Sequence, residues 1–306
     1  MHAEDIPNGR MVFASCNICG SDEYREICGI EINPTMVPSK LVKCKRCGLF
    51  YANPRLNREA EEDYYKVRYL QDIGKNYWYG GRINVLRKSL REMCGFFEKS
   101  GRLIDVGCGM GYFMDLARGK GWETAGVEIS DLAVDHAREE LGLDVRKGNL
   151  GEAMFEKESF DAATMWNVLD QLYDPRGALM ELNRMLKKGG YLFIRVQNNY
   201  FHLKLYRFSN VSGRSFKNFT DHFAIFHPYS FNKDSIKRLL ESTGFSGVIV
   251  KPESVSLGHF FNVNALTWAI KILMKSVDLA ARIVFFITLG RIVISPSIFV
   301  IAKKAQ

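Results

Sequence analysis

Short apolar runs and amphipathic stretches alternate along the central part of this 306-residue chain. The apolar runs predict buried strands, and the stretches between them have the spacing of helices that cover a sheet. We expect strands at 103–106, 126–129, 159–166, 191–196, 247–250 and 297–302. We expect helices at 81–98, 112–120 and 231–243, and a further helix that ends at 185–190. This order predicts an α/β fold.

The first of these strands leads into a glycine-rich turn. Gly107, Gly109 and Gly111 stand at alternate positions, and backbone N–H groups can approach a ligand closely where no Cβ intervenes. The helix that follows would direct its positively polarised N-terminus at the same ligand. A dinucleotide fingerprint needs its third glycine one residue later, where Tyr112 stands, so the spacing argues against a dinucleotide site.

A carboxylate ends the next predicted strand. Glu128 follows Gly111 by 17 residues, and an acid at this place can accept hydrogen bonds from both hydroxyls of a ribose. Together with the segment 159–175 and the helix end at 185–190, this order resembles the class I S-adenosylmethionine-dependent methyltransferases over about residues 80–255. The alternative is an α/β domain with an incidental glycine turn. The resemblance implies a Rossmann-like seven-stranded sheet with an antiparallel last strand, and S-adenosylmethionine as the methyl donor.

The resemblance also implies which residues bind the donor. Asp105 would orient the methionine amino group, directly or through water, and the glycines would pass beneath the methionine and ribose. Glu128 would bind the ribose hydroxyls, with Ile129 against the adenine and Asn149 near its amino group. Trp166 would end the fourth strand, where the acceptor cleft opens. The full set is Asp105, Gly107, Gly109, Gly111, Glu128, Ile129, Asn149, Leu150 and Trp166.

On the acceptor side, the chain departs from the family pattern. The segment 167–175 has Asp170-Gln171 where relatives usually carry Glu-His, which removes one histidine as a base. Asp221 and His222 resemble the acid-histidine element of sugar C-methyltransferases, and an imidazole titrates near neutrality. We therefore expect His222 to be the catalytic base and Asp221 to orient it or to bind the acceptor. The alternative is that His222 caps or packs a lid.

Four of the seven cysteines form two Cys-x-x-Cys pairs, Cys16 with Cys19 and Cys44 with Cys47. Two such pairs can hold one tetrahedral zinc ion, and four thiolates leave no open position, so the zinc would be structural. Disulfides are the alternative, which an intracellular setting disfavours. The arrangement resembles the N-terminal zinc module of sugar C-methyltransferases, but we expect no counterpart of their further C-terminal domain.

These patterns predict three parts of the chain: a zinc-binding module at 1–55, a helical connection at 56–100 and the methyltransferase domain at 101–306. Within the last part, the polar and basic stretch 199–220 is the expected acceptor lid. Residues 255–295 form a helical insertion before the last strand.

The net charge of +8 comes from the C-terminal third, where residues 199–306 carry fourteen Lys or Arg and five Asp or Glu. This excess suits nucleic acid, anionic lipid or a phosphorylated substrate, or it is only a solvated surface. On a helix over 265–286, the charged residues fall within an arc of about 60° around the axis, and apolar residues fill most of the remaining surface. The charged residues are Lys271, Lys275, Asp278 and Arg282. Such a helix suits a membrane interface, and packing in the core or a dimer is the alternative.

The first five residues lack the apolar core of a signal peptide, and no run of eighteen uncharged apolar residues occurs. We expect a cytoplasmic protein, peripheral at the inner membrane surface, with a small or lipid-linked acceptor such as a sugar derivative. An RNA methyltransferase is the second hypothesis, but residues 166–169 lack the Asn/Asp-Pro-Pro-aromatic element, so nucleic acid is not the expected partner. A non-enzymatic, cofactor-binding adapter at membranes is the third.

Overall fold

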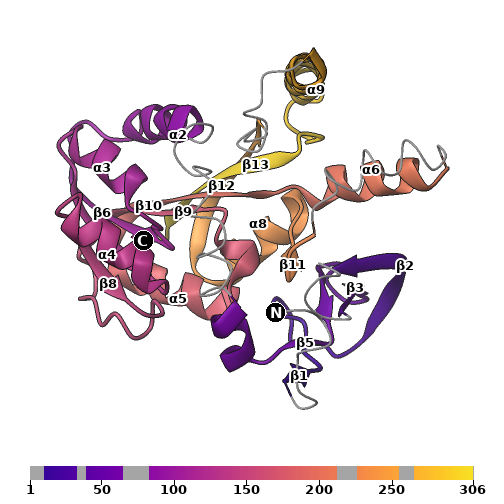
Figure 1. The fold of residues 1–306 in the computed structure, drawn as a ribbon, viewed down its shortest axis with the longest axis horizontal. Helices are drawn as coiled ribbons and strands as arrows, with labels where there is room; N and C mark the ends of the chain where they lie inside the picture. The colour runs from indigo at the N-terminus through magenta and orange to yellow at the C-terminus, as the bar shows by residue number, and fades with distance from the viewer. Residues whose placement is uncertain (1–9, 33–38, 65–82, 212–225, 255–264, 306) are drawn as a thin grey trace.

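A seven-stranded sheet forms the centre of the molecule (Figure 1). The computed structural model describes residues 10–32, 39–64, 83–211, 226–254 and 265–305. The sheet has the order β12-β13-β10-β9-β6-β7-β8. Its strands are β6 (Arg102–Val106), β7 (Glu123–Glu128), β8 (Asp144–Lys147), β9 (Phe160–Trp166), β10 (Leu186–Gln197), β12 (Phe245–Glu253) and β13 (Ser297–Lys304).

The five strands from β6 to β10 are parallel, and β13 runs antiparallel between β10 and β12. This confirms the predicted α/β class, the seven strands and the antiparallel last strand. Helices cover both faces of the sheet, so the central strands are buried on both sides and have nearly continuous apolar sequences. Figure 1 shows these strands enclosed between helices.

The two faces of the sheet have separate apolar layers. Phe193 of β10 packs with Met93 of α2 (Ile83–Cys94) and Phe113 of α3 (Tyr112–Arg118). The neighbouring Ile194 points to the opposite face, which belongs to the cluster that includes Leu182. That face is covered by α5 (Pro175–Met185) and α8 (Lys233–Ser242), while α4 (Asp131–Glu139) packs beside β8.

One element boundary was predicted wrongly. The Lys-Lys-Gly-Gly run that we assigned to a helix end lies in β10, because α5 already ends at Met185. Leu186 is buried and pairs with Phe160, and the register against β9 then shifts before Tyr191. The exposed lysines and Gly189, at φ +77°, resemble a helix C-cap in the sequence but form this irregular strand entry.

The N-terminal part forms a second sheet with the order β11-β4-β3-β2. Its strands are β2 (Tyr24–Ile32), β3 (Ser39–Cys44), β4 (Phe50–Asn53) and β11 (Tyr229–Ser230), and β1 (Met11–Val12) pairs separately with β5 (Arg55–Leu56). Because β11 comes from beyond residue 200, this sheet joins two distant parts of the chain. A helix at 58–64 follows β5.

The N-terminal sheet is also attached to the helices of the large domain. The Asn17 side chain donates to Asp174, the N-cap residue of α5, at 2.9 Å. The Arg238 side chain in α8 donates to the backbone oxygen of Cys47 at 2.7 Å. From the expected lid, residues 199–211 form α6 (Asn199–Val211), which packs on this sheet through Leu203 and Tyr206; residues 212–220 are not among those described.

The predicted insertion before the last strand is present as α9 (Ala265–Ile287). In Figure 1 this helix stands at the top of the molecule, away from the N-terminal sheet at the lower right. Within the described residues, no helix has the length and apolarity needed to cross a membrane.

Candidate functional site

The glycine-rich loop joins β6 to α3 and is fastened to the end of β7. The N–H groups of Gly107 and Cys108 donate to the oxygen of Val127 at 2.8 and 3.2 Å. The Gly109 N–H donates to Glu128 Oε2 at 2.9 Å. The loop and the acid that the sequence assigned to one ligand therefore lie in direct contact.

Glu128 is held firmly at this loop. The residue is 7% exposed, and Oε1 accepts from the N–H groups of Ile129 and Ser130 at 2.8 and 3.0 Å. Burial raises the pKa of Glu128, and the three backbone N–H donors oppose that rise. Because Oε2 accepts only one bond among the described residues, it keeps acceptor capacity for a hydroxyl group. Glu128 could therefore accept a hydrogen bond from a ribose hydroxyl.

Two of the three glycines have a further role that the sequence did not indicate. A Cβ on Gly107 would lie 2.6 Å from the Val168 side chain, and one on Gly111 would lie 2.5 Å from Leu143. Both residues also have positive φ angles, +64° and +83°. Gly107 therefore lets the turn after β9 pack directly on the loop, whereas Gly111 lets α3 begin close to β8.

Of the predicted donor-binding residues, Asp105 lies inside the protein and Trp166 is half-buried. Asp105 is 1% exposed, and its Oδ1 accepts from the Thr164 hydroxyl at 2.7 Å. Burial raises the pKa of Asp105 to about 7. The Trp166 ring packs between Phe113 and Phe299, with centroid distances of 4.7 and 6.0 Å. Both side chains are placed by packing, and their contact with a donor stays a prediction.

The expected adenine side includes one residue that sequence reasoning missed. Asn149 donates from its side chain to Glu62 Oε1 at 2.9 Å, so the helix at 58–64 reaches this side of the site. Ile129 is half-buried and Leu150 is buried. No pattern in the sequence distinguishes Glu62 from the other acids of its helix, because the contact spans 87 residues.

The turn after β9 is the expected acceptor side. Val168 packs on Gly107, and Asn167 has a φ of +60°. The Gln171 side chain donates to the Asn167 oxygen at 2.6 Å, and the Arg195 guanidinium donates to the Asn167 side chain. Asp221 and His222 lie in the part of the chain that the structure does not describe.

The same turn brings together two titratable side chains that sequence reasoning did not select. Asp170 lies in a single helical turn, η2 (Leu169–Gln171), and His227 Nε2 lies 4.0 Å from its Oδ2. The only sequence signal was the position of Asp170-Gln171 where relatives usually carry Glu-His, and nothing paired it with His227.

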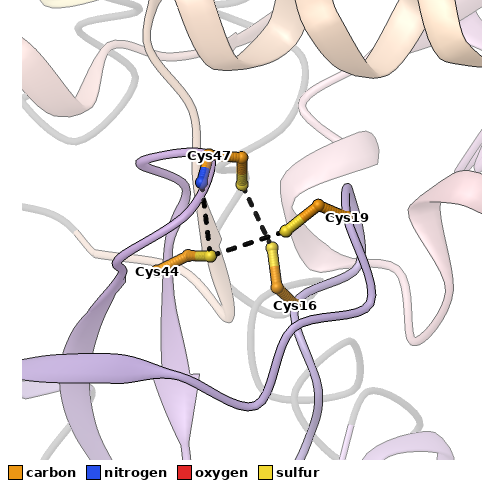
Figure 2. A group of neighbouring side chains, drawn as sticks. All are labelled: Cys16, Cys19, Cys44 and Cys47. Carbon is orange, nitrogen blue, oxygen red and sulfur yellow. Dashed lines mark hydrogen bonds between the residues drawn. The ribbon is translucent and has the colours of Figure 1, made fainter.

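The four paired cysteines meet at one point (Figure 2). Their sulfur atoms all lie within 4.8 Å of one another, with Cys16–Cys47 at 3.3 Å and Cys19–Cys44 at 3.6 Å. Zn–S bonds of about 2.3 Å in a tetrahedron put sulfur atoms roughly 3.8 Å apart. The spacing fits one ion, and it exceeds the S–S bond of about 2.05 Å in a disulfide.

The backbone around the cysteines also suits a cation. Gly20 and Gly48, after the two pairs, have φ angles of +71° and +79°, and the Cys47 N–H donates to Cys44 Sγ at 3.5 Å. Burial raises the pKa of the Cys16 thiol. A buried cluster of four thiolates needs a positive charge to stay deprotonated, which a zinc ion supplies.

Comparisons with known proteins agree with this geometry. One match, a protein from Mycolicibacterium smegmatis named a probable S-adenosylmethionine-dependent methyltransferase, is 28% identical over 56% of this chain. This chain spans only 60% of that relative's length. The ubiquinone biosynthesis O-methyltransferase of Aliivibrio fischeri is 24% identical over 68% of this chain and 97% of its own.

A solved structure shares the fold. It is a chain from the complex between the Haloferax volcanii Trm112 methyltransferase activator and a methyltransferase, with a TM-score of 0.51 and 17% identity over 80% of this chain and 96% of that chain. A family model described as a methyltransferase domain matches residues 77–249, which is more than half of the sequence. The chain therefore belongs to this methyltransferase family.

Proposed function

We propose that this protein transfers a methyl group from S-adenosylmethionine to a small or lipid-linked acceptor, with sugar derivatives as one acceptor class. The observation that carries the proposal is the contact between Glu128 and the Gly109 N–H at the ends of two parallel strands. The donor supplies a methyl group already activated by its sulfonium charge. The protein then has to align donor and acceptor and to manage the acceptor's proton.

The donor-binding roles follow from position along the sheet. Glu128 would bind the ribose, and the loop 107–111 would pass beneath the methionine and ribose. Asp105, which is buried, would orient the methionine amino group directly or through water. The adenine would lie toward the side of the site formed by Ile129, Asn149 and Leu150, with Trp166 supporting the strand end.

The function is tested with a methyl-labelled donor and a pooled small-molecule extract, followed by mass spectrometry of labelled products. The similarity to proteins named ubiquinone biosynthesis O-methyltransferase supports the inclusion of hydroxyl acceptors in the pool. We expect a labelled product from the parent protein and none from Gly109→Arg. Labelled RNA in a parallel reaction, with no small-molecule product, would contradict the proposed acceptor class.

His222 and Asp221 remain predictions from the sequence. If His222 is the base, His222→Ala should lower the methylation rate by about 10²–10⁴-fold, since positioned proton transfer contributes that much. Donor affinity, measured by calorimetry, should barely change because a base for the acceptor's proton is not expected to contact the donor. An unchanged rate would leave His222 as a packing residue of the lid.

We further propose that Cys16, Cys19, Cys44 and Cys47 hold one structural zinc ion. The distances between their sulfur atoms and the four-thiolate donor set support this. The module supports the grouping with zinc-module methyltransferases such as those that C-methylate sugars. The module's role would be to fix β4, and through β4 the paired strand β11.

A peripheral contact with anionic membranes is the proposed role of α9. Ala281 marks the side of α9 that is buried against the protein, and large apolar residues elsewhere on the helix are exposed. Phe286 is 81% exposed, and Leu289, just after the helix, is 87% exposed. The exposed set is Ile272, Leu273, Leu279, Ile283, Phe286, Ile287, Leu289 and Ile292. Single exposed apolar side chains are ordinary on a protein surface, whereas several along one segment can mark a contact with a partner or a membrane.

The charges of α9 favour lipid over a second protein as the occupant of this patch. Lys275 and Arg282 are exposed along one edge of the apolar face, and Arg291 is exposed beyond its end. The Asp278 carboxylate accepts from Arg282 at 3.1 Å and offsets one of these charges. An apolar face with basic residues at its edge is the usual form of a helix that lies in a membrane interface.

Reversal of these charges tests the contact. We expect Lys275→Glu with Arg282→Glu to weaken binding to vesicles rich in phosphatidylserine by roughly 1 kcal/mol or more per charge. Lys120→Glu with Lys157→Glu makes the same charge change at exposed sites elsewhere and should have a smaller effect. Flotation measures both. Turnover of a soluble acceptor should survive; a parent protein that does not float with the vesicles would contradict the proposed contact.

A further inference from the structure

A buried carboxyl and an imidazole meet at the acceptor end of the sheet. Asp170 is 1% exposed, and its Oδ2 accepts from the Gln197 N–H at a long 3.4 Å. His227 Nε2 lies 4.0 Å from the same oxygen. Within the described part of the chain, the other oxygen, Oδ1, has no hydrogen-bond partner. One oxygen of a buried carboxyl group is thus without a partner there, and few buried polar atoms in native proteins are in that position.

The pair lies beside the donor loop. Val168, two residues before Asp170, fills the space that the missing Cβ of Gly107 leaves open. The turn between them is fixed, because Gln171 donates to the Asn167 oxygen and Asn167 holds a left-handed backbone conformation. A non-glycine residue at positive φ is rare and concentrates at functional sites. Asp170 therefore has a fixed place at the point where donor and acceptor must meet.

His227 is positioned from the opposite side by the N-terminal sheet. The next residue, Pro228, accepts from the Ala52 N–H at 2.8 Å, and β11 then pairs with β4. The Arg55 guanidinium donates to the Tyr229 hydroxyl and to the Tyr173 oxygen, both at 2.8 Å. The contacts of residues 52–55 with residues 228–229 and with Tyr173 thus hold His227 next to the turn that contains Asp170.

The charged surroundings suit a proton-accepting pair. Burial raises the pKa of Asp170 to about 7, and the Gln197 N–H and the positive charge of Arg195 oppose the rise. Arg195 is the charged group facing Asp170 from β10, His227 is the titratable group on the other side, and the Tyr229 hydroxyl of β11 is bonded to Arg55. With 4.0 Å between His227 Nε2 and Asp170 Oδ2, the two groups are close enough for their titrations to be coupled.

We propose that His227, oriented by Asp170, is the base that accepts the proton of the methyl acceptor; this rests on the proposed methyl transfer. The proton of the acceptor's X–H bond moves to a ring nitrogen of His227, and the electron pair on X forms the bond to the methyl carbon. The pair of the breaking carbon–sulfur bond stays on sulfur, which leaves as S-adenosylhomocysteine. The imidazolium then returns its proton to water. Asp170 is a positioning residue in this scheme.

Titration of His227 by NMR tests the pairing without any acceptor. In protein labelled with ¹³C-histidine, the resonance of His227 is the one that His227→Gln removes. We expect two titration steps in the parent protein and one in Asp170→Asn, with the midpoint lowered by about one pH unit. Asp144→Asn, at an exposed carboxylate, is the matched control. A resonance that titrates identically in Asp170→Asn would overturn the pairing.

Kinetics test the role as base, with the labelled donor and the pooled extract as probes. We expect His227→Gln to lower the rate about 10²–10⁴-fold while donor affinity stays within about twofold. Asp170→Asn should shift the pH profile as well as lower the rate. Loss of activity in His222→Ala with a normal rate in His227→Gln would overturn the proposal in favour of the other histidine. A parent protein that binds no donor would instead contradict the proposed function.

Discussion

Replacement of Cys44 by serine should unfold the N-terminal sheet while the seven-stranded sheet stays folded. Cys44 ends β3, is buried, and lies 3.6 Å from Cys19 between their sulfur atoms. Structural zinc contributes about 10–16 kcal/mol of binding free energy in small zinc modules, so loss of one ligand should remove several kcal/mol from this sheet. Elemental analysis should show about one zinc per parent chain, and hydrogen exchange should show early opening of β2 to β4 in the variant.

Cys94→Ser is the matched control for this variant. Cys94 is a half-buried free thiol in α2 with no place in the cluster. It should leave the zinc content and the exchange of the N-terminal sheet unchanged. A native protein without zinc, in which residues 10–56 resist protease, would contradict the assignment of a zinc module.

Replacement of Glu128 by alanine should have the second large effect. It leaves the N–H groups of Gly109, Ile129 and Ser130 without their acceptor and removes the partner expected for the ribose. Lost ribose hydrogen bonds account for about 1–3 kcal/mol, and disorder of the loop adds to this. We expect donor affinity to fall at least about a hundredfold by calorimetry.

Two further variants separate binding from folding in this experiment. Glu128→Gln keeps one carbonyl oxygen for the backbone donors and should preserve more of the thermal stability than the alanine variant. Glu123→Ala removes a mostly exposed acid at the start of β7, bonded only to Arg102 in the described structure, and should leave donor affinity unchanged. Equal affinity in Glu128→Ala and the parent protein would show that the donor lies elsewhere.

The sequence predicted the central sheet well for a physical reason. Strands buried on both faces must be apolar along their whole length, so 103–106 and 159–166 were visible as short runs. The entry to β10 was missed because Gly189 and the lysines before it match a helix end equally well. Only the pairing of Leu186 with Phe160 distinguishes the two cases.

Contacts between distant segments could not be predicted from local patterns. Strand β11 is two residues long and pairs with β4 across more than 170 positions, so no periodicity marks it. The meeting of Asp170 with His227 depends on that pairing. In the same way, the sequence explained Gly107 by ligand approach, whereas its contact with Val168 shows that packing of the acceptor turn also requires glycine.

The cysteine cluster was predictable because the two-residue spacing within each Cys-x-x-Cys pair is the spacing that zinc ligands require. Two pairs, each with two intervening residues, can converge only if the sheet brings the turns together, and β2 to β4 do so. Asp105 is a different case. The family pattern implies donor contact, which stays a prediction, and gives no sign of the bond between Asp105 and Thr164 inside the sheet.

Calorimetric titration of the parent chain with S-adenosylmethionine tests the central claim, that the loop after β6 binds a methyl donor. We predict saturable binding of one donor per chain, no comparable binding of NAD, and loss of donor binding in Gly109→Arg. In that variant a large side chain replaces a glycine at φ +55° whose N–H is bonded to Glu128. Tight binding of NAD, or donor binding that Gly109→Arg leaves intact, would contradict the account.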